Sequence, residues 1–91
     1  IISLGSEGGL AVLPDKAYRI PPLPIEVVSA AGAGDGVLAG LAASISRRQP
    51  IEDGLRLGFA CGSAVCLMPG TAECKREDVE RLRPQIILEA L

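Results

Sequence analysis

The feature that most constrains this chain is a glycine-rich turn, Gly32-Ala33-Gly34-Asp35-Gly36, that runs directly into the apolar stretch from Val37 to Ile45. The pattern predicts a helix that begins at the turn, and the first N–H groups of a helix have no partners within it. The helix dipole adds partial positive charge at the same end. The segment therefore predicts a backbone site for an anion, with the carboxylate of Asp35 beside it.

Asp35 gives this turn two alternative interpretations. A carboxylate beside an anion site can accept a proton from a hydroxyl while the N–H groups stabilise negative charge on the group that is transferred, which suits phosphoryl transfer to an alcohol. Alternatively, the glycines only form a tight turn and Asp35 satisfies N–H groups of the first helical turn. The spacing alone leaves both interpretations open.

Two other phosphate-binding loops are excluded by the residues themselves. A dinucleotide-binding G-x-G-x-x-G fingerprint would need glycine where Val37 stands, and the Gly-Lys-Ser/Thr of a Walker A loop occurs nowhere in the chain. The turn therefore belongs to neither class.

The run from Val28 to Gly40 resembles a family signature. Its G-A-G-D core resembles the D-T-x-G-A-G-D pattern near the C-terminal end of ribokinase and phosphofructokinase B (PfkB) family carbohydrate kinases. Ser29 and Ala30 stand where the family usually has Asp and Thr, and serine there resembles the 1-phosphofructokinases and tagatose-6-phosphate kinases. In many relatives the Asp-Thr pair helps to position a monovalent cation, so the resemblance does not carry potassium activation over to this chain.

Other segments extend the resemblance over nearly the whole chain. Ser3 to Gly9 resembles the family's strand and loop at the ATP phosphates, Ala60 to Ala64 and Met68 to Thr71 resemble the adenine side, and Arg76 to Val79 resembles the last helix. The resemblance implies ATP-dependent phosphorylation of a sugar or sugar-phosphate hydroxyl, with Mg²⁺ bound through ATP and no metal ligand from this chain. The implied site residues are the base Asp35, an anion hole at Gly32, Ala33 and Gly34, and nucleotide contacts at Ser3, Gly5, Gly8, Gly62 and Ser63.

The resemblance also predicts the fold class and the extent of the domain. Residues 1–91 are expected to be a single partial domain of the α/β class, the C-terminal portion of a ribokinase-like three-layer α/β/α fold. The sugar-binding and lid part would be absent, so this piece alone is expected to be inactive. Hydrophobic residues make up 48% of the 91 residues, a large share for a domain that buries so little of its surface. Association with missing segments, or a homo-oligomer, is therefore expected.

The expected order of elements is short strands followed by helices. Pro21 to Pro24 should be an extended connector, because three of its four residues lack an N–H. We expect a buried helix from Asp35 to Arg47, whose Arg47 and Arg48 form a solvated end and not a phosphate clamp. The remaining predictions are strands at 1–4, 10–13, 17–20 and 25–28, a sandwiched helix from Pro50, a surface helix at 75–82, and a final strand or loose tail at 86–88.

Composition excludes several function classes. The chain has nine basic and eleven acidic residues without a basic stripe, and only two residues are aromatic. The composition therefore does not indicate nucleic-acid binding. The absence of histidine excludes a Ser-His-Asp triad and a His-ligated metal site within this chain. Cys61, Cys66 and Cys74 form no C-x-x-C pair and indicate a reducing cytoplasm. No apolar run approaches the ~20 residues of a membrane span, so a soluble, cytoplasmic protein is expected.

Two alternatives remain at this level. One is a kinase of the same family that acts on ribose or a nucleoside. The other, from a different class, is a non-catalytic nucleotide-binding or oligomerisation fragment.

Overall fold

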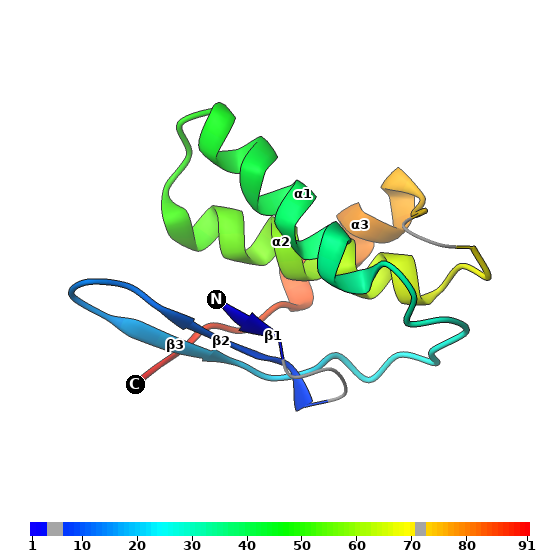
Figure 1. The fold of residues 1–91 in the computed structure, drawn as a ribbon, viewed down its shortest axis with the longest axis horizontal. Helices are drawn as coiled ribbons and strands as arrows, with labels where there is room; N and C mark the ends of the chain where they lie inside the picture. Colours follow the sequence, from blue (N-terminus) through cyan, green and yellow to red (C-terminus); the bar gives the residue numbers. More distant parts are fainter. Residues whose placement is uncertain (4–6, 71–72) are drawn as a thin grey trace.

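The computed structural model describes residues 1–3, 7–70 and 73–91. Its helices lie on one face of a small sheet, and the body measures 38 × 27 × 19 Å (Figure 1). The elements in order are β1 (Ile2–Ser3), β2 (Gly9–Val12), β3 (Ala17–Ile20), α1 (Ala33–Ser46), α2 (Ile51–Cys66), α3 (Arg76–Leu82), the 3-10 turn η2 (Arg83–Gln85) and β4 (Glu89–Ala90).

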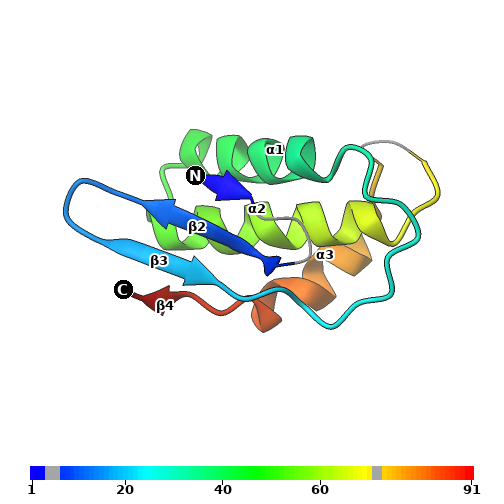
Figure 2. The ribbon, with the colours of Figure 1, turned by 60° about the horizontal axis from the view of Figure 1, so that its bottom comes forward.

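The sheet is antiparallel, with strand order β1-β2-β3-β4 (Figure 2). β2 and β3 form the predicted hairpin. Successive side chains alternate between the two faces of a strand, so Ala11 and Ile20 are buried in the core while Val12 is exposed. A final strand is present, but it lies at Glu89–Ala90, beyond the predicted 86–88, because Ile86 is buried in the core instead.

Hydrogen bonds to Glu52 connect the hairpin to the start of α2. Lys16 Nζ donates a hydrogen bond to Glu52 Oε2 at 2.6 Å, and the Tyr18 hydroxyl donates to the same oxygen at 2.9 Å. These donors favour the charged carboxylate, and together with the Glu52 backbone they lower the pKa of Glu52 to about 2. The ionised form of Glu52 therefore ties the sheet layer to the helix layer.

α1 and α2 pack with their backbones in direct contact, and glycines make this approach possible. A Cβ on Gly40 would lie 2.7 Å from the Cα of Gly58, and a Cβ on Gly62 would lie 2.7 Å from Val37 Cγ2. α3 packs against α2 as well. The prediction that the second helix is sandwiched is therefore confirmed, and its buried apolar side chains are Leu55, Phe59, Ala60, Ala64 and Val65.

The prediction that α1 is deeply buried is wrong for its outer side. Leu38 is 62% exposed and Ile45 is 58% exposed. Of the described elements, α2 supplies the main packing for α1 and covers only the side that carries Val37, Gly40 and Ser44. The apolar outer side of α1 is thus left open in this chain.

The predicted strand from Ile25 to Val28 is also wrong, because the structure has no strand there. The N–H groups of Val28 and Ser29 donate to the carbonyl oxygen of Cys66 at 2.8 and 3.2 Å. The last carbonyls of a helix lack partners within the helix, and here the C-terminal end of α2 accepts the Val28 donor, while the N–H of Ile25 donates to Leu23 O at 2.9 Å, so neither donor is left for a neighbouring strand. The glycine turn therefore follows an irregular segment and not the carboxyl end of a strand.

Surface features agree with several simple expectations. Arg47 and Arg48 are exposed at the end of α1. Cys61 and Cys66 are partly buried and Cys74 is exposed, all as free thiols. Of the helices in the part of the chain that the structure describes, none combines the length and the apolarity that crossing a bilayer requires.

Candidate functional site

The glycine turn forms the N-terminal end of α1. Gly32 precedes the helix with φ 83° and ψ 2°, in the left-handed region that favours glycine, and no side chain caps the helix. The N–H of Ala33 donates to Ala30 O at 3.2 Å, and the N–H of Gly36 donates to Gly32 O at 3.0 Å. Between these two, the N–H groups of Gly34 and Asp35 have no backbone acceptor among the described residues. These two N–H groups are the ones available to an anion.

Gly34 has no structural reason to be a glycine. A Cβ built on it would meet nothing within 4 Å, and its φ lies outside the left-handed region. Alanine would suit a helix better at this position. Neither packing nor backbone conformation requires glycine here, whereas the close approach of a ligand to the backbone would.

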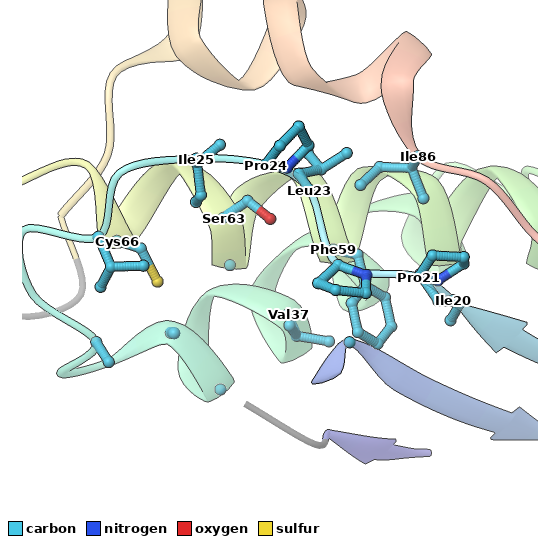
Figure 3. A pocket seen from close by; sticks show the side chains of 17 residues that line it. Ile20, Pro21, Leu23, Pro24, Ile25, Val37, Phe59, Ser63, Cys66 and Ile86 are labelled. Carbon is cyan, nitrogen blue, oxygen red and sulfur yellow. The ribbon is translucent and has the colours of Figure 1, made fainter. Parts of the chain in front are cut away.

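A cavity of about 850 Å³ opens next to this turn, between the connector and the helices (Figure 3). Its volume lies within the range of small-molecule sites. Side chains of Leu23 and Ile25 from the connector, Val37 from α1, and Ser63 and Cys66 from α2 surround the same space. The cavity is largely apolar, and the Ser63 hydroxyl is a polar group on its wall.

The structure brings five of the predicted site residues to this one cavity. They come from the loop before β2, the turn and α2, and they are Gly8, Ala33, Gly34, Gly62 and Ser63.

Two of these glycines have packing roles as well. Gly8 has φ 87°, and a Cβ there would collide with Ile20 O, so backbone contact with the end of β3 requires a glycine. A Cβ on Gly62 would lie 3.0 Å from Ala33 O. Their presence in the wall is thus compatible with a ligand, but their identity as glycine is explained by packing.

The remaining predicted residues lie outside the cavity wall. Gly32 and Asp35 stand directly before and after the wall residues Ala33 and Gly34 in the sequence. The Asp35 side chain is exposed, and the described residues form no ion pair or side-chain hydrogen bond with it. The side chain of Ser3 and the whole of Gly5 lie outside the described part of the chain.

Sequence reasoning missed the connector as a wall of the site. Pro21, Leu23 and Ile25 are partly buried, while Pro22 and Pro24 between them are exposed. A usable signal was present: apolar residues that alternate with prolines cannot be buried by strand pairing, so they must be covered by other elements.

Ser29, which stands at the position of the usual family aspartate, serves the local turn. Its hydroxyl oxygen accepts a hydrogen bond from the N–H of Ala31 at 3.3 Å. No group of three or more Asp, Glu, Cys or His side chains that could hold a metal ion occurs within residues 1–3, 7–70 and 73–91. The donor set of this region therefore does not fit a Mg²⁺ ion held by protein ligands alone.

Comparison with known proteins shows which family the chain belongs to. The model of the pfkB family carbohydrate kinases matches residues 1–78. The chain belongs to the pfkB family. This pfkB chain is 42% identical over 81 residues to ATP-dependent 6-phosphofructokinase isozyme 2 of Mycobacterium tuberculosis, covering 89% of this chain and 24% of that protein. It is 34% identical over 88 residues to 1-phosphofructokinase of Bacillus subtilis, covering 94% of this chain and 28% of that protein.

A solved structure agrees with the fold of this pfkB chain. Phosphofructokinase-2 of Escherichia coli, crystallised in complex with potassium, superposes with a TM-score of 0.84 at 30% identity, over 91% of this chain and 27% of that one. The predicted family and the predicted ribokinase-like fold are confirmed. The chain spans about a quarter of the length of the relatives that it matches.

Proposed function

We propose that the intact protein transfers the γ-phosphoryl group of ATP to a hydroxyl of a sugar or sugar phosphate, and that this chain supplies the nucleotide side and the catalytic base. The observation that carries the proposal is Gly34. Its unpaired N–H and the open space where a side chain would stand lie at the wall of a ligand-sized cavity, directly before Asp35. Membership of a carbohydrate kinase family supports the same chemistry.

The proposed reaction assigns a role to each part of the site. The apolar cavity takes the adenosine part of ATP, with the Ser63 hydroxyl as a polar contact. The N–H groups of Gly34 and Asp35 stabilise negative charge on the phosphoryl group as it moves. The acceptor oxygen bonds to the γ-phosphorus, the bond from phosphorus to the ADP oxygen breaks, and the acceptor proton passes to the Asp35 carboxylate.

Magnesium enters this scheme with the nucleotide. Because the described residues do not provide a dedicated ligand cluster, Mg²⁺ would be held mainly by the phosphates, whose charge it neutralises. The Ser29 hydroxyl already serves the backbone of its own turn, so we assign no potassium ion to it.

The acceptor is proposed as a class. The serine at position 29 favours sugar phosphates, and ribose or a nucleoside is the alternative within the family. A panel of fructose 6-phosphate, fructose 1-phosphate, tagatose 6-phosphate and ribose, tested with the intact protein, separates them. With acceptors of this class we propose a cytoplasmic enzyme.

Replacement of the base tests the proposal. In the intact protein, Asp35→Asn should lower kcat by about 10²- to 10⁴-fold, the usual contribution of a general base, while ATP affinity stays within a few-fold. The matched control is Asp53→Asn. Asp53 lies in the first turn of α2, so this substitution removes an equal charge from an equivalent helix end. Undiminished turnover of the Asp35 variant would take the base role away from this residue. A wild-type protein that binds ATP but phosphorylates no acceptor would favour the non-catalytic alternative.

A further inference from the structure

A second cavity, of about 530 Å³, lies between α1, α2 and α3, and it shares no lining residue with the first. Figure 1 shows the arrangement of these three helices. We call it the arginine groove. Its floor is apolar and consists mostly of small side chains, namely Ala39, Gly40, Ala43, Leu57, Cys61 and Val79.

The charged residues of the arginine groove come from separate places in the chain. Arg47 follows the end of α1, Arg76 begins α3, and Arg83 follows α3. The carboxylate in the lining is that of Glu80, which accepts a hydrogen bond from Arg76 Nε at 3.2 Å. Three guanidinium groups against one carboxylate leave the groove with a net charge of +2.

Two of the three arginines of the groove have no carboxylate partner. Arg19, Arg56 and Arg81 each form an ion pair with a nearby carboxylate. Arg47 and Arg83, in the groove, have no ion pair among the described residues; Arg48 is also without one, but it does not line the groove. Arginines left without a carboxylate beside an apolar floor are available to an external anion, and their planar guanidinium groups match a phosphate in a two-pronged geometry.

The charge of Arg83 acts on the floor of the groove. Burial raises the pKa of the Cys61 thiol, the nearby Cys74 adds to this rise, and the positive charge of Arg83 opposes it. An anion resting on this floor would therefore be exposed to the same positive charge.

The groove faces a different side of α1 from the apolar surface that the chain leaves open. Leu38 and Ile45, seven residues apart, lie on one side of the helix, whereas Ala39, Ala43 and Arg47 recur every fourth residue on another. The apolar side is the one suited to burial against further protein, since charged arginines are seldom buried without partners. The charged side is suited to solvent and to a charged ligand.

We propose that the arginine groove binds a small phosphorylated metabolite, at a site separate from the cavity beside the glycine turn. The volume suits a small molecule, the arginines supply the contacts to phosphate, and the apolar floor accommodates the body of the ligand. The proposal thereby gives Arg47 a phosphate contact, where the sequence predicts only a solvated helix end. This inference does not depend on the proposed kinase activity.

Pyrophosphate is the probe for this proposal, with thermal melting of the intact protein as the measurement. Binding to the folded state should raise Tm in a saturable manner. The groove variant is Arg47→Gln/Arg83→Gln. Its control is Arg48→Gln/Arg81→Gln, which makes the same change in charge at residues that do not line the groove. Gly34→Ala reports on binding at the glycine turn.

We expect the pyrophosphate concentration at half-saturation to rise by about tenfold or more in the groove variant, because hydrogen bonds between charged groups are worth more than 1.4 kcal/mol. The control and Gly34→Ala should stay within about twofold of wild type. An equal rise of the half-saturation concentration in the control would show that the effect depends only on net charge. A loss in Gly34→Ala would assign the binding to the turn, and an absence of saturable stabilisation would remove the site; each of these outcomes overturns the proposal.

Discussion

Substitution of Gly34 by alanine should separate stability from activity. The added methyl group meets nothing within 4 Å, so it causes no clash, and alanine is preferred to glycine in a helix by about 0.5–1 kcal/mol. An intact protein of a few hundred residues should then melt about 1–4 °C higher. The same methyl group would stand where the transferred phosphate approaches the N–H groups of Gly34 and Asp35. Loss of one such donor typically costs about 10²- to 10³-fold in kcat.

The assay is turnover with saturating ATP and acceptor, measured beside a melting curve for each variant of the intact protein. Gly40→Ala is the matched control on the same helix. Its Cβ would lie 2.7 Å from the Cα of Gly58, so overpacking should destabilise the protein by about 1–3 kcal/mol, with activity lost only as the protein unfolds. Full activity in Gly34→Ala would show that the open space at Gly34 does not serve the phosphate. A lowered Tm for Gly34→Ala would contradict the packing argument itself.

Two further predictions concern stability and thiol chemistry. The pKa of Glu52 is about 2 in the folded protein against a usual 4.5, so its contribution to stability is full above pH 4.5 and lost as pH falls through 2. The Tm difference between wild type and Glu52→Gln should accordingly be largest above pH 5 and vanish near pH 2, and a pH-independent difference would refute the tie to Lys16 and Tyr18. Burial raises the pKa of Cys61 and Cys66 while Cys74 is exposed, so a thiol reagent at pH 8 should show one fast phase that Cys74→Ser removes. A fast phase that persists in that variant would place the reactive thiol elsewhere.

Local sequence signals predicted the helices and the hairpin well. α1 and α2 begin within two residues of their predicted starts, because a glycine turn and Pro50 mark them, and β3 spans the predicted 17–20. The segment from Ile25 to Val28 has the β-branched composition of a strand, yet the N–H of Ile25 donates to Leu23 O and the N–H of Val28 donates to Cys66 O at the end of α2. Composition predicts whether a segment prefers the extended conformation, but it does not predict which distant carbonyl accepts the hydrogen bonds of its N–H groups.

The part of the candidate site that the backbone of the glycine turn forms could be predicted from the sequence. The part that tertiary packing forms could not. The G-A-G-D letters located the turn and Asp35. The connector wall depends on where a proline-rich segment crosses α2, which no periodicity encodes. The exposure of Leu38 and Ile45 was missed for a related reason. An apolar pattern predicts that one side of a helix is buried, but the segment that buries it need not lie in this chain.

The contact between the backbones of α1 and α2 limits how this site can diverge. Gly40, Gly58 and Gly62 cannot acquire larger side chains without separating the two helices, and those helices carry the glycine turn and Ser63 respectively. A lineage that changed its ligand would have to keep this spacing fixed. Variation in the shape of the cavity is therefore expected in the connector, at positions such as Leu23 and Ile25, and a survey of related sequences should find diversity there beside invariance at the three glycines.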